Sequence, residues 1–572
     1  MPIPDVPPRP EAPFPGQWAF EASGVAIGRG WNRVWQGSGP HRLSLAFPRG
    51  DRLAAHPHDR RPTYAELGRQ RLDGRWVFHG EVMELPPGGD PWDRQSPSRR
   101  HAEAMHAFGW LGDVLVVEDS GPREALRLAL EWRRLFGRWN AFAWSGKALE
   151  RRVFNWACGL PAMIGLAAEA EGAGLCQDLA RQARALLSGG GAPDRAMERA
   201  AAAGVAGAAL AGAAGDRLLD AALRRLERGL PSAVLPDGGH ASRTPERALE
   251  LLFDLLALDD GLSQRGRPPP AELSRAIDRL FTAVRAFTLA DGRLPCLQGG
   301  DESRASRIRA ALASDDGAGR CPNVLPDSGY HRLEAGQMQV FVDAGPPARG
   351  IWSTAAVAQP LAVEIVAGGR RLITQVGWTP DNDAPAALRL ADGGSTASLD
   401  ESSAGAPVRG AWLDLLGPRL AGGAAHVWAD RAAAPEGAVL DMGHDGWVRS
   451  LGLWHQRSLF LSPEGELRGE DAFTPLKPGD PSGPRRYVAF TVRFHLDPEV
   501  SASVARDKRS VLLRVGPHAG WRLRNDAADV LIEPSLHYRN GEARRTSQMV
   551  LKGMIRLDIG GRVRWKLSPA EA

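Results

Sequence analysis

The chain has 572 residues, of which 43% are hydrophobic and 24% are charged, with a formal net charge of +4. This composition is typical of a globular protein with two or three domains, and it excludes a disordered or fibrous chain. Neither a Walker-type phosphate loop nor a dinucleotide-binding fingerprint is present, and no motif indicates nucleic-acid binding.

Residues 1–97 are rich in Pro, Gly and Trp, and we expect them to wrap as an arm on a larger body. Within the arm, DGRWVFHGEV predicts one or two short strands. The first residues, MPIPDVPPRPEAPFPGQW, lack the basic and apolar regions of a secretory signal. No apolar stretch reaches membrane-spanning length. We therefore expect a cytoplasmic protein, and a periplasmic location is the alternative.

Residues 98–315 have the pattern of a helical region. Apolar residues recur at three- and four-residue spacing in about eight segments, which short turns separate. Successive antiparallel helices can stack and close into an incomplete α/α toroid with a groove on one face. A plain helical bundle is the alternative. The Ala-rich run at residues 200–214 is expected to be a helix packed against other helices.

Residues 326–572 have the pattern of strands and follow a linker-like stretch at residues 314–325. Segments such as MQVFVDAG and RRYVAFTVRFHL alternate apolar and polar residues, and GG, EG and DK pairs stand where hairpin turns belong. Residues 381–407 are expected to form a loop. Ten or more strands fit a large β-sandwich. The expected fold class is a multidomain α and β protein, in which an incomplete α/α toroid precedes a large antiparallel β-sandwich.

The cysteines give no sign of a metal site. Cys158, Cys176, Cys296 and Cys321 are widely spaced and form no CxxC or zinc-finger pattern. We expect unpaired thiols, and neither a metal nor a cofactor.

Several strings, in order, carry a family resemblance over roughly residues 98–560. They include AWSGKALERRVFNW, LPDGGHASRTPERALELLFDLL, FTLADGRLPCLQGGDES and LPDSGYHRLEAGQMQVFVDAG. In this order they resemble the bacterial heparinase II/III-like family. The resemblance implies an α/α toroid joined to a β-sandwich, and a lyase that cleaves acidic polysaccharide next to a uronic acid.

The resemblance implies a site in the groove. β-Elimination needs a cation that neutralises the uronate carboxylate, a base and an acid. His240 is the candidate base. The alternative is that His240 has a structural role and orders the turn. Tyr330 is the second catalytic candidate, and a core position in the first strand is its alternative.

Further residues are candidates for substrate binding. Arg243 is expected to bind an anionic sugar or to form a surface salt bridge, and Trp144 to stack on a sugar or to fill a helix core. Arg152 and Asn155 stand where the family has an arginine followed shortly by Asn-Trp.

The sequence also departs from the family pattern. RAMERAAAAGVAGAAL has no Asn-His pair, and SRTPERALE has no tyrosine. Val357 and Gly394 stand where the family's sandwich carries histidines, so no structural zinc is expected there.

Three functions therefore remain open. One is a lyase for acidic polysaccharide, and another is a catalytically eroded glycan-binding or envelope-polysaccharide scaffold of the same fold. The third is a glycosidase that uses Asp237 with Asp291, which needs carboxyl groups about 5–10 Å apart.

Overall fold

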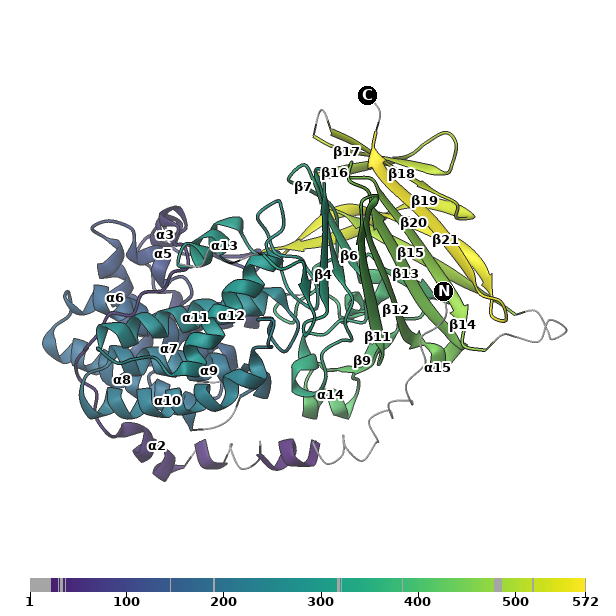
Figure 1. Cartoon of the computed structure of the whole chain (residues 1–572). Coiled ribbons are helices and arrows are strands. Elements are labelled where there is room, and N and C mark those ends of the chain that lie inside the picture. Colours follow the sequence, from purple (N-terminus) through teal and green to yellow (C-terminus); the bar gives the residue numbers. More distant parts are fainter. Residues whose placement is uncertain are drawn as a thin grey trace.

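The computed structural model describes residues 22–570, except residues 29, 31–33, 37, 145, 189–190, 316–318, 320, 383, 478–485 and 517–518. The segment examined for a secretory signal, residues 1–18, lies outside the described residues, as does part of the predicted linker. Most helices lie on the left of Figure 1, and the large sheets lie on the right. This arrangement is the predicted fold class.

The described part of the arm lies against the helices. Helix α2 (Gly39–Ala46) contacts α8 (Glu169–Leu187), where the Gln177 side chain donates to the carbonyl of Ala46 at 2.8 Å. Further along, α3 (Ala65–Leu72) precedes an antiparallel hairpin of β1 (Arg75–Phe78) and β2 (Glu81–Glu84). The two predicted short strands are confirmed.

The helical region follows the predicted segments with two differences. One segment, HAEAMHAFGWLGDVLVV, forms two helices, because Phe108 ends the first with a positive φ of 56°. A short helix that was not predicted begins at Ala305. The remaining bounds are α4 (Arg99–Ala107), α5 (Leu111–Leu115), α6 (Gly121–Phe136), α7 (Gly146–Ile164), α9 (Ala196–Ala209), α10 (Gly212–Ala233), α11 (Pro245–Gln264), α12 (Ala271–Phe287) and α13 (Ala305–Leu312).

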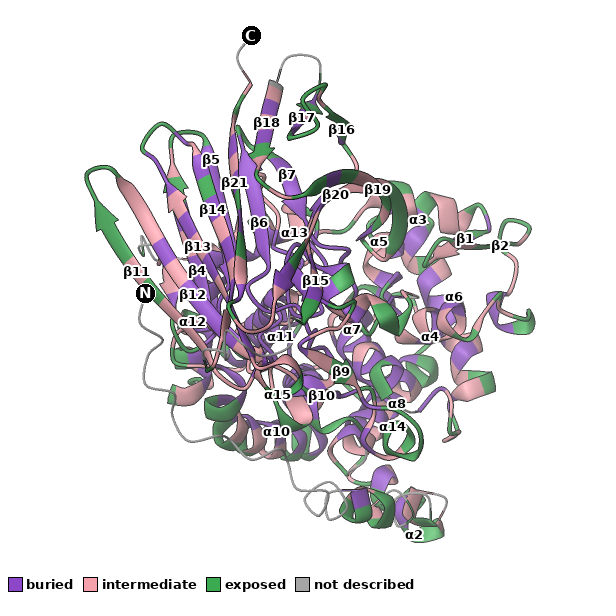
Figure 2. Cartoon of the chain, turned by 90° about the vertical axis from the view of Figure 1, so that its right-hand side faces the viewer, coloured by how far each residue is buried: buried purple, intermediate pink, exposed green. Residues whose placement is uncertain are grey.

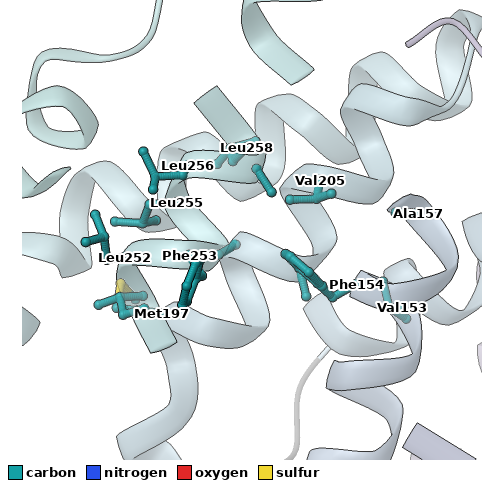
Figure 3. Close-up of a cluster of buried hydrophobic side chains, with 14 of the residues drawn as sticks. Val153, Phe154, Ala157, Met197, Val205, Leu252, Phe253, Leu255, Leu256 and Leu258 are labelled. Atoms are coloured by element: carbon teal, nitrogen blue, oxygen red, sulfur yellow. The ribbon is translucent and has the colours of Figure 1, made fainter. Parts of the chain in front are cut away.

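Helix α9 is the centre of the helical region. From Ala200 to its end every residue is buried, and it packs against α7, α8, α10 and α11. Its small residues permit this close packing: a Cβ at Gly207 would lie 2.5 Å from the backbone nitrogen of Leu219 in α10. Figure 3 shows the apolar side chains that α7, α9 and α11 contribute to this core. Residues 200–209 of the Ala-rich run are therefore a buried helix packed against other helices, as predicted, whereas residues 212–214 already belong to α10.

The strand region is a sandwich of two antiparallel sheets. One has the order β11-β12-β13-β14-β21-β18-β17-β16, and the other has β19-β20-β15-β7-β6-β5-β4-β3 with β8 paired to β15. The bounds are β3 (Val324–Leu325), β4 (Tyr330–Ala335), β5 (Met338–Asp343), β6 (Val363–Ala367), β7 (Arg370–Thr374), β8 (Ala397–Leu399), β11 (Val427–Ala434), β12 (Gly437–Trp447), β13 (Leu453–Leu461), β14 (Leu467–Pro475), β15 (Tyr487–Leu496), β16 (Val500–Val504), β17 (Ser510–Val515), β18 (Ala519–Asn525), β19 (Asp529–Arg539), β20 (Glu542–Arg556) and β21 (Gly561–Pro569).

The predicted hairpin turns join neighbouring strands. Gly368 and Gly369 have φ of 58° and 70° between β6 and β7, a region that residues other than glycine rarely adopt. The EG and DK pairs likewise lie between β13 and β14 and between β16 and β17. The predicted loop at residues 381–407 instead contains β8, β9 (Gly405–Pro407) and 3₁₀ turns, and β9 pairs with β10 (Leu420–Gly422).

The helical core continues onto the outer face of the longer sheet. Tyr330, Phe341 and Val366 belong to the same apolar cluster as the helices, whereas the opposite face of this sheet packs on the second sheet. Strand β6 is consequently buried along its length (Figure 2). The described residues include no helix that is long and apolar enough to cross a membrane.

Candidate functional site

A cleft of about 920 Å³ opens where the arm, the helices and the sandwich loops meet. The arm contributes residues 57–64 and the tip of the β1–β2 hairpin. The helices contribute α5, α7 and α11, and the sandwich contributes residues 379–382 and 540–541. Because all three parts of the chain line it, the cleft depends on how they dock.

The walls of the cleft carry equal numbers of basic and acidic residues. Their basic residues are Arg60, Arg61, Lys147, Arg151, Arg195, Arg247, Arg304 and Arg307, and their acidic residues are Asp59, Asp113, Glu198, Glu246, Glu250, Asp254, Asp301 and Asp381. The two sets are equal in number. A groove built mainly to attract a polyanion would instead have an excess of cations.

One ion-pair network joins the arm to α7 and α11. Asp254 accepts hydrogen bonds at 2.8 Å from both Arg61 and Arg151. One turn earlier on α11, Glu250 accepts from Arg61 at 3.0 Å and forms an ion pair with Arg307. Residues four apart lie on one helix face, so both carboxylates point the same way. These arginines therefore have carboxylate partners within the chain.

A second network lies on the wall next to the sandwich. Arg195 forms an ion pair with Glu150, and Arg247 binds Asp194 and Glu198 at 3.1 and 3.2 Å. At the rim, Lys147 of α7 binds Asp381 of the sandwich at 2.7 Å. Lys147, Arg195 and Arg247 are thus also paired with carboxylates.

Glu246 differs from the other carboxylates of the cleft. Burial is the main cause that raises its pKa from 4.5 to about 8, and the negative charge of Asp301 is the second cause. Its Oε2 accepts the backbone N–H of Asp301 at 2.9 Å. At neutral pH this carboxyl is protonated, so it can donate a hydrogen bond to a ligand.

His240 lies behind the cleft wall, and the described lining does not include it. It is 1% exposed, and its Nδ1 accepts the backbone N–H of Ser242 at 3.1 Å. Its ring packs edge-on against Trp352, with the centroids 5.3 Å apart. Burial, and then the charge of Arg247, lower its pKa to about 3. This placement matches the turn-ordering alternative, and catalysis by His240 stays a prediction.

The structure brings Tyr330 and Arg243 together between the helices and the sandwich. The Tyr330 hydroxyl donates to the carbonyl of Arg243 at 2.6 Å, and its ring packs against Phe287 and Phe341. Arg243 forms a buried ion pair with Asp343. Neither residue is in the described lining of the cleft. Tyr330 has the core position given as its alternative, and the Arg243 ion pair is buried, not on the surface as expected.

Of the three substrate-binding candidates on or near α7, one lines the cleft and two are buried in the core. Asn155 lines the cleft and donates to the carbonyl of Ala107 at 2.9 Å. Arg152 instead is fully buried with its guanidinium 4.2 Å from the Trp132 ring centroid, and burial lowers its pKa to about 9. Trp144 is 5% exposed and donates to the carbonyl of Phe136, so it fills the core as its alternative predicted.

Val357 and Gly394, which stand where the family's sandwich carries histidines, are closely packed against their neighbours. Val357 is buried, and a Cβ at Gly394 would lie 2.8 Å from side-chain atoms of Gln359. Gln359 thus fills the space beside Gly394, so a histidine there would clash. The two carboxylates of the glycosidase alternative are also engaged: Asp237 accepts from Ser328, and Asp291 pairs with Arg371 at 2.9 Å.

Sequence reasoning missed Tyr64, Arg151 and Glu246, which line the cleft. The Tyr64 hydroxyl lies 2.7 Å from that of Ser306, and the Arg304 guanidinium lies 5.2 Å from the Tyr64 ring centroid. A signal was available in the arm, where HPHDRRPTY concentrates charged and aromatic residues. A second was the spacing of acidic residues in PERALELLFDLL, where Glu246, Glu250 and Asp254 fall on one helix face.

The fold and the cleft define a protein of the class that joins an α/α toroid to a β-sandwich. Residues 317–566 match the family described as Heparinase II/III-like, C-terminal. The chain belongs to the heparinase II/III-like family. It is 51% identical over 542 residues to FtsZ-localized protein C of Caulobacter vibrioides (strain NA1000 / CB15N). This match covers 94% of each of the two chains.

Solved structures share the fold at low sequence identity. The crystal structure of Heparinase III matches with a TM-score of 0.69 and 12% identity, covering 97% of this chain and 92% of that chain. A mutant of heparan sulfate lyase HepC from Pedobacter heparinus matches with a TM-score of 0.57 and 14% identity, covering 93% and 87%. At such identities the likeness shows the fold alone.

Proposed function

We propose that this chain is a glycan-binding protein that does not cleave its ligand, and that it acts where FtsZ assembles. The pairing of most cations of the cleft with carboxylates is the observation that carries the first part. β-Elimination needs an available cation to neutralise a uronate carboxylate. Six of the eight basic residues in the described lining have a carboxylate of the chain as partner: Arg61, Lys147, Arg151, Arg195, Arg247 and Arg307. Of the other two, Arg60 donates to the Ser314 hydroxyl and Arg304 lies over the Tyr64 ring.

The lining of the cleft suits a sugar with many hydroxyl groups. It offers the amides of Asn155 and Asn540, together with the rings of Tyr64 and Phe78. Amides donate and accept hydrogen bonds, and aromatic faces cover the apolar face of a sugar ring. With charges of both signs on the walls, the favoured ligand is a glycan that is uncharged or carries both signs. A purely acidic polysaccharide is the competing ligand.

The relative supports the second part of the proposal. That protein is named for its localisation with FtsZ, and half of its residues are identical to this chain over nearly the whole length. The match covers 94% of both chains, so it includes the arm, the helices and the sandwich. We propose that this chain localises with FtsZ as its relative does.

The localisation is tested with a fluorescent fusion of the full chain in Caulobacter vibrioides cells that lack FtsZ-localized protein C and carry labelled FtsZ. The fusion should coincide with FtsZ, and purified chain should sediment with FtsZ polymers. Diffuse fluorescence together with no co-sedimentation would refute this part.

Glycan binding is tested with purified chain on an array of neutral, acidic and mixed-charge oligosaccharides. We expect binding to neutral or mixed-charge glycans, which Asn155→Ala should weaken. The matched control is Asn525→Ala. Asn525 lies in β18 of the sandwich and is not part of the described cleft lining. Binding confined to acidic glycans, or unchanged in Asn155→Ala, would argue against this cleft as the site.

A further inference from the structure

A buried group of metal-ligating side chains lies outside the described lining of the cleft, where the loop after α12 meets β19. Cys296 and Glu302 come from the loop and His537 from β19. The thiol sulfur, a carboxylate oxygen and an imidazole nitrogen all lie within 4.8 Å of one another. The three residues are 4%, 1% and 0% exposed. Residues distant in sequence thus meet in a site that bulk water does not reach.

The hydrogen bonds of His537 determine which ring nitrogen faces the group. Its Nδ1 lies 2.8 Å from the carbonyl oxygen of Gln375, which only accepts, so the hydrogen is on Nδ1. Nε2 is 3.5 Å from Oε2 of Glu302, and neither atom has a hydrogen-bond partner. In the neutral ring, Nε2 presents a lone pair to a carboxylate oxygen. Two buried acceptors that face each other require a cation or a further proton between them.

The surroundings of Glu302 leave this oxygen available. Arg539 and Arg293 both pair with the other oxygen, Oε1, whereas Arg371 lies 3.6 Å from Oε2, beyond hydrogen-bond distance. The wider cluster contains the guanidinium groups of Arg293, Arg371 and Arg539, the buried carboxyl groups of Glu302, Glu364 and Asp497, and the partly buried carboxylate of Asp291. Carboxyl groups outnumber guanidinium groups four to three, although burial raises the pKa of Glu364 to about 7. Binding of a cation would displace the proton of the Cys296 thiol. The cluster can therefore accept further positive charge.

We propose that Cys296, Glu302 and His537 bind a zinc-class divalent cation that links the loop after α12 to β19. Sulfur, imidazole nitrogen and carboxylate oxygen are the ligand types that zinc takes in proteins. A backbone carbonyl on the far ring nitrogen, like that of Gln375, orients a metal-binding histidine. Ligands of zinc lie about 3–4 Å apart, so a small closure of the group would complete the site. Its position predicts that it fixes the docking of the helices on the sandwich.

The metal content of the purified full chain, grown with added zinc and then desalted, tests the proposal by elemental analysis. We expect about one zinc ion per chain, which Cys296→Ser and His537→Gln each lower severalfold. Cys176→Ser, in a buried thiol of α8, is the matched control and should keep its zinc. A chain without zinc, or zinc unchanged in Cys296→Ser, would overturn the proposal. The facing acceptors would then share a proton, as an imidazolium–carboxylate pair.

A second measurement does not depend on variants that change a ligand. Cobalt(II) added to metal-free wild-type chain should give a thiolate-to-cobalt charge-transfer band in the near ultraviolet. The band should persist in a chain with Cys158→Ser, Cys176→Ser and Cys321→Ser, which keeps Cys296 as its one cysteine. Absence of the band in folded wild type, or its loss in the triple variant, would overturn the assignment of Cys296 as a ligand.

Discussion

Arg243, in the loop before α11, forms a buried ion pair with Asp343 at the end of β5. The same guanidinium donates to the carbonyls of Ser328 and Pro346 at 2.7 and 2.9 Å. Arg243 thereby attaches the helical region to the first strands of the sandwich. A residue expected to bind substrate holds together the domains that form the cleft.

Removing either partner of this pair should destabilise the whole chain. Asp343→Asn leaves the Arg243 charge buried without its counter-charge, which costs about 3–5 kcal/mol. Thermal unfolding measures the effect. Arg99→Ala, which removes an exposed pair with Glu103, is the control and should change stability by less than about 0.5 kcal/mol. Equal effects of the two substitutions would show that Arg243 does not hold the interface.

His240 is expected to stabilise its turn. His240→Ala removes the acceptor for the Ser242 N–H and opens a cavity, so it should cost about 2–4 kcal/mol. His240→Asn can accept the same N–H and should recover part of that loss. Thermal unfolding of both variants tests the role. If folded His240→Asn lost glycan binding while keeping stability, a functional role would replace the structural one.

The buried, neutral His240 also makes stability depend on pH. Its pKa is about 3 in the folded chain and near 6.5 when unfolded, so only the unfolded chain takes up the proton between these values. The contribution of His240 is complete above pH 6.5 and is lost as the pH falls toward 3. His240→Asn should therefore show a shallower loss of thermal stability from pH 7 to pH 5 than wild type. Parallel pH curves would contradict a neutral His240.

Glu246 produces the opposite pH dependence. Its pKa of about 8 in the folded chain exceeds the ordinary 4.5, so the folded chain keeps a proton that the unfolded chain has lost. Stability therefore falls as the pH rises from 4.5 to 8, by no more than about 1.4 kcal/mol per pH unit. Glu246→Gln keeps an acceptor for the Asp301 N–H and should raise the melting temperature more at pH 8 than at pH 5. An equal change at both pH values would contradict a protonated Glu246.

The charge balance of the cleft should control which glycans bind. Glu250→Gln removes a partner of Arg61 and Arg307 and leaves the walls with an excess of cations. Affinity for acidic oligosaccharides should then rise about threefold to tenfold, on the order of 1 kcal/mol. Titration calorimetry compares this variant with Glu103→Gln, which changes charge on α4 outside the described cleft lining. Unchanged affinity would mean that acidic glycans do not enter this cleft.

The order of helices and strands was predictable because each depends on a local pattern. The three-to-four spacing of α11 and the GG turn before β7 are both visible in the sequence. The break at Phe108 was not predictable, because apolar spacing continues across it. The division at residues 97, 315 and 326 stays a prediction, although α13 ends at Leu312 and β3 begins at Val324.

The site was less predictable than the fold. Family strings pointed to His240 and Tyr330, but the packing of Trp352, Phe287 and Phe341 around them buries both. Asn155 reaches the cleft, whereas Arg152, three residues earlier, points to the core. Cys296 and His537 are 241 positions apart, and sequence spacing cannot bring such residues together.

The most direct test of a cleft that binds without cleaving is the ultraviolet absorbance of the unsaturated uronate that β-elimination releases. Purified full chain is incubated with heparan sulfate, alginate and other uronate polysaccharides. We expect no rise above the protein-free control on any substrate. A steady rise that Arg151→Ala or Tyr64→Phe abolishes would show that the cleft is a working lyase site and would contradict the proposed function.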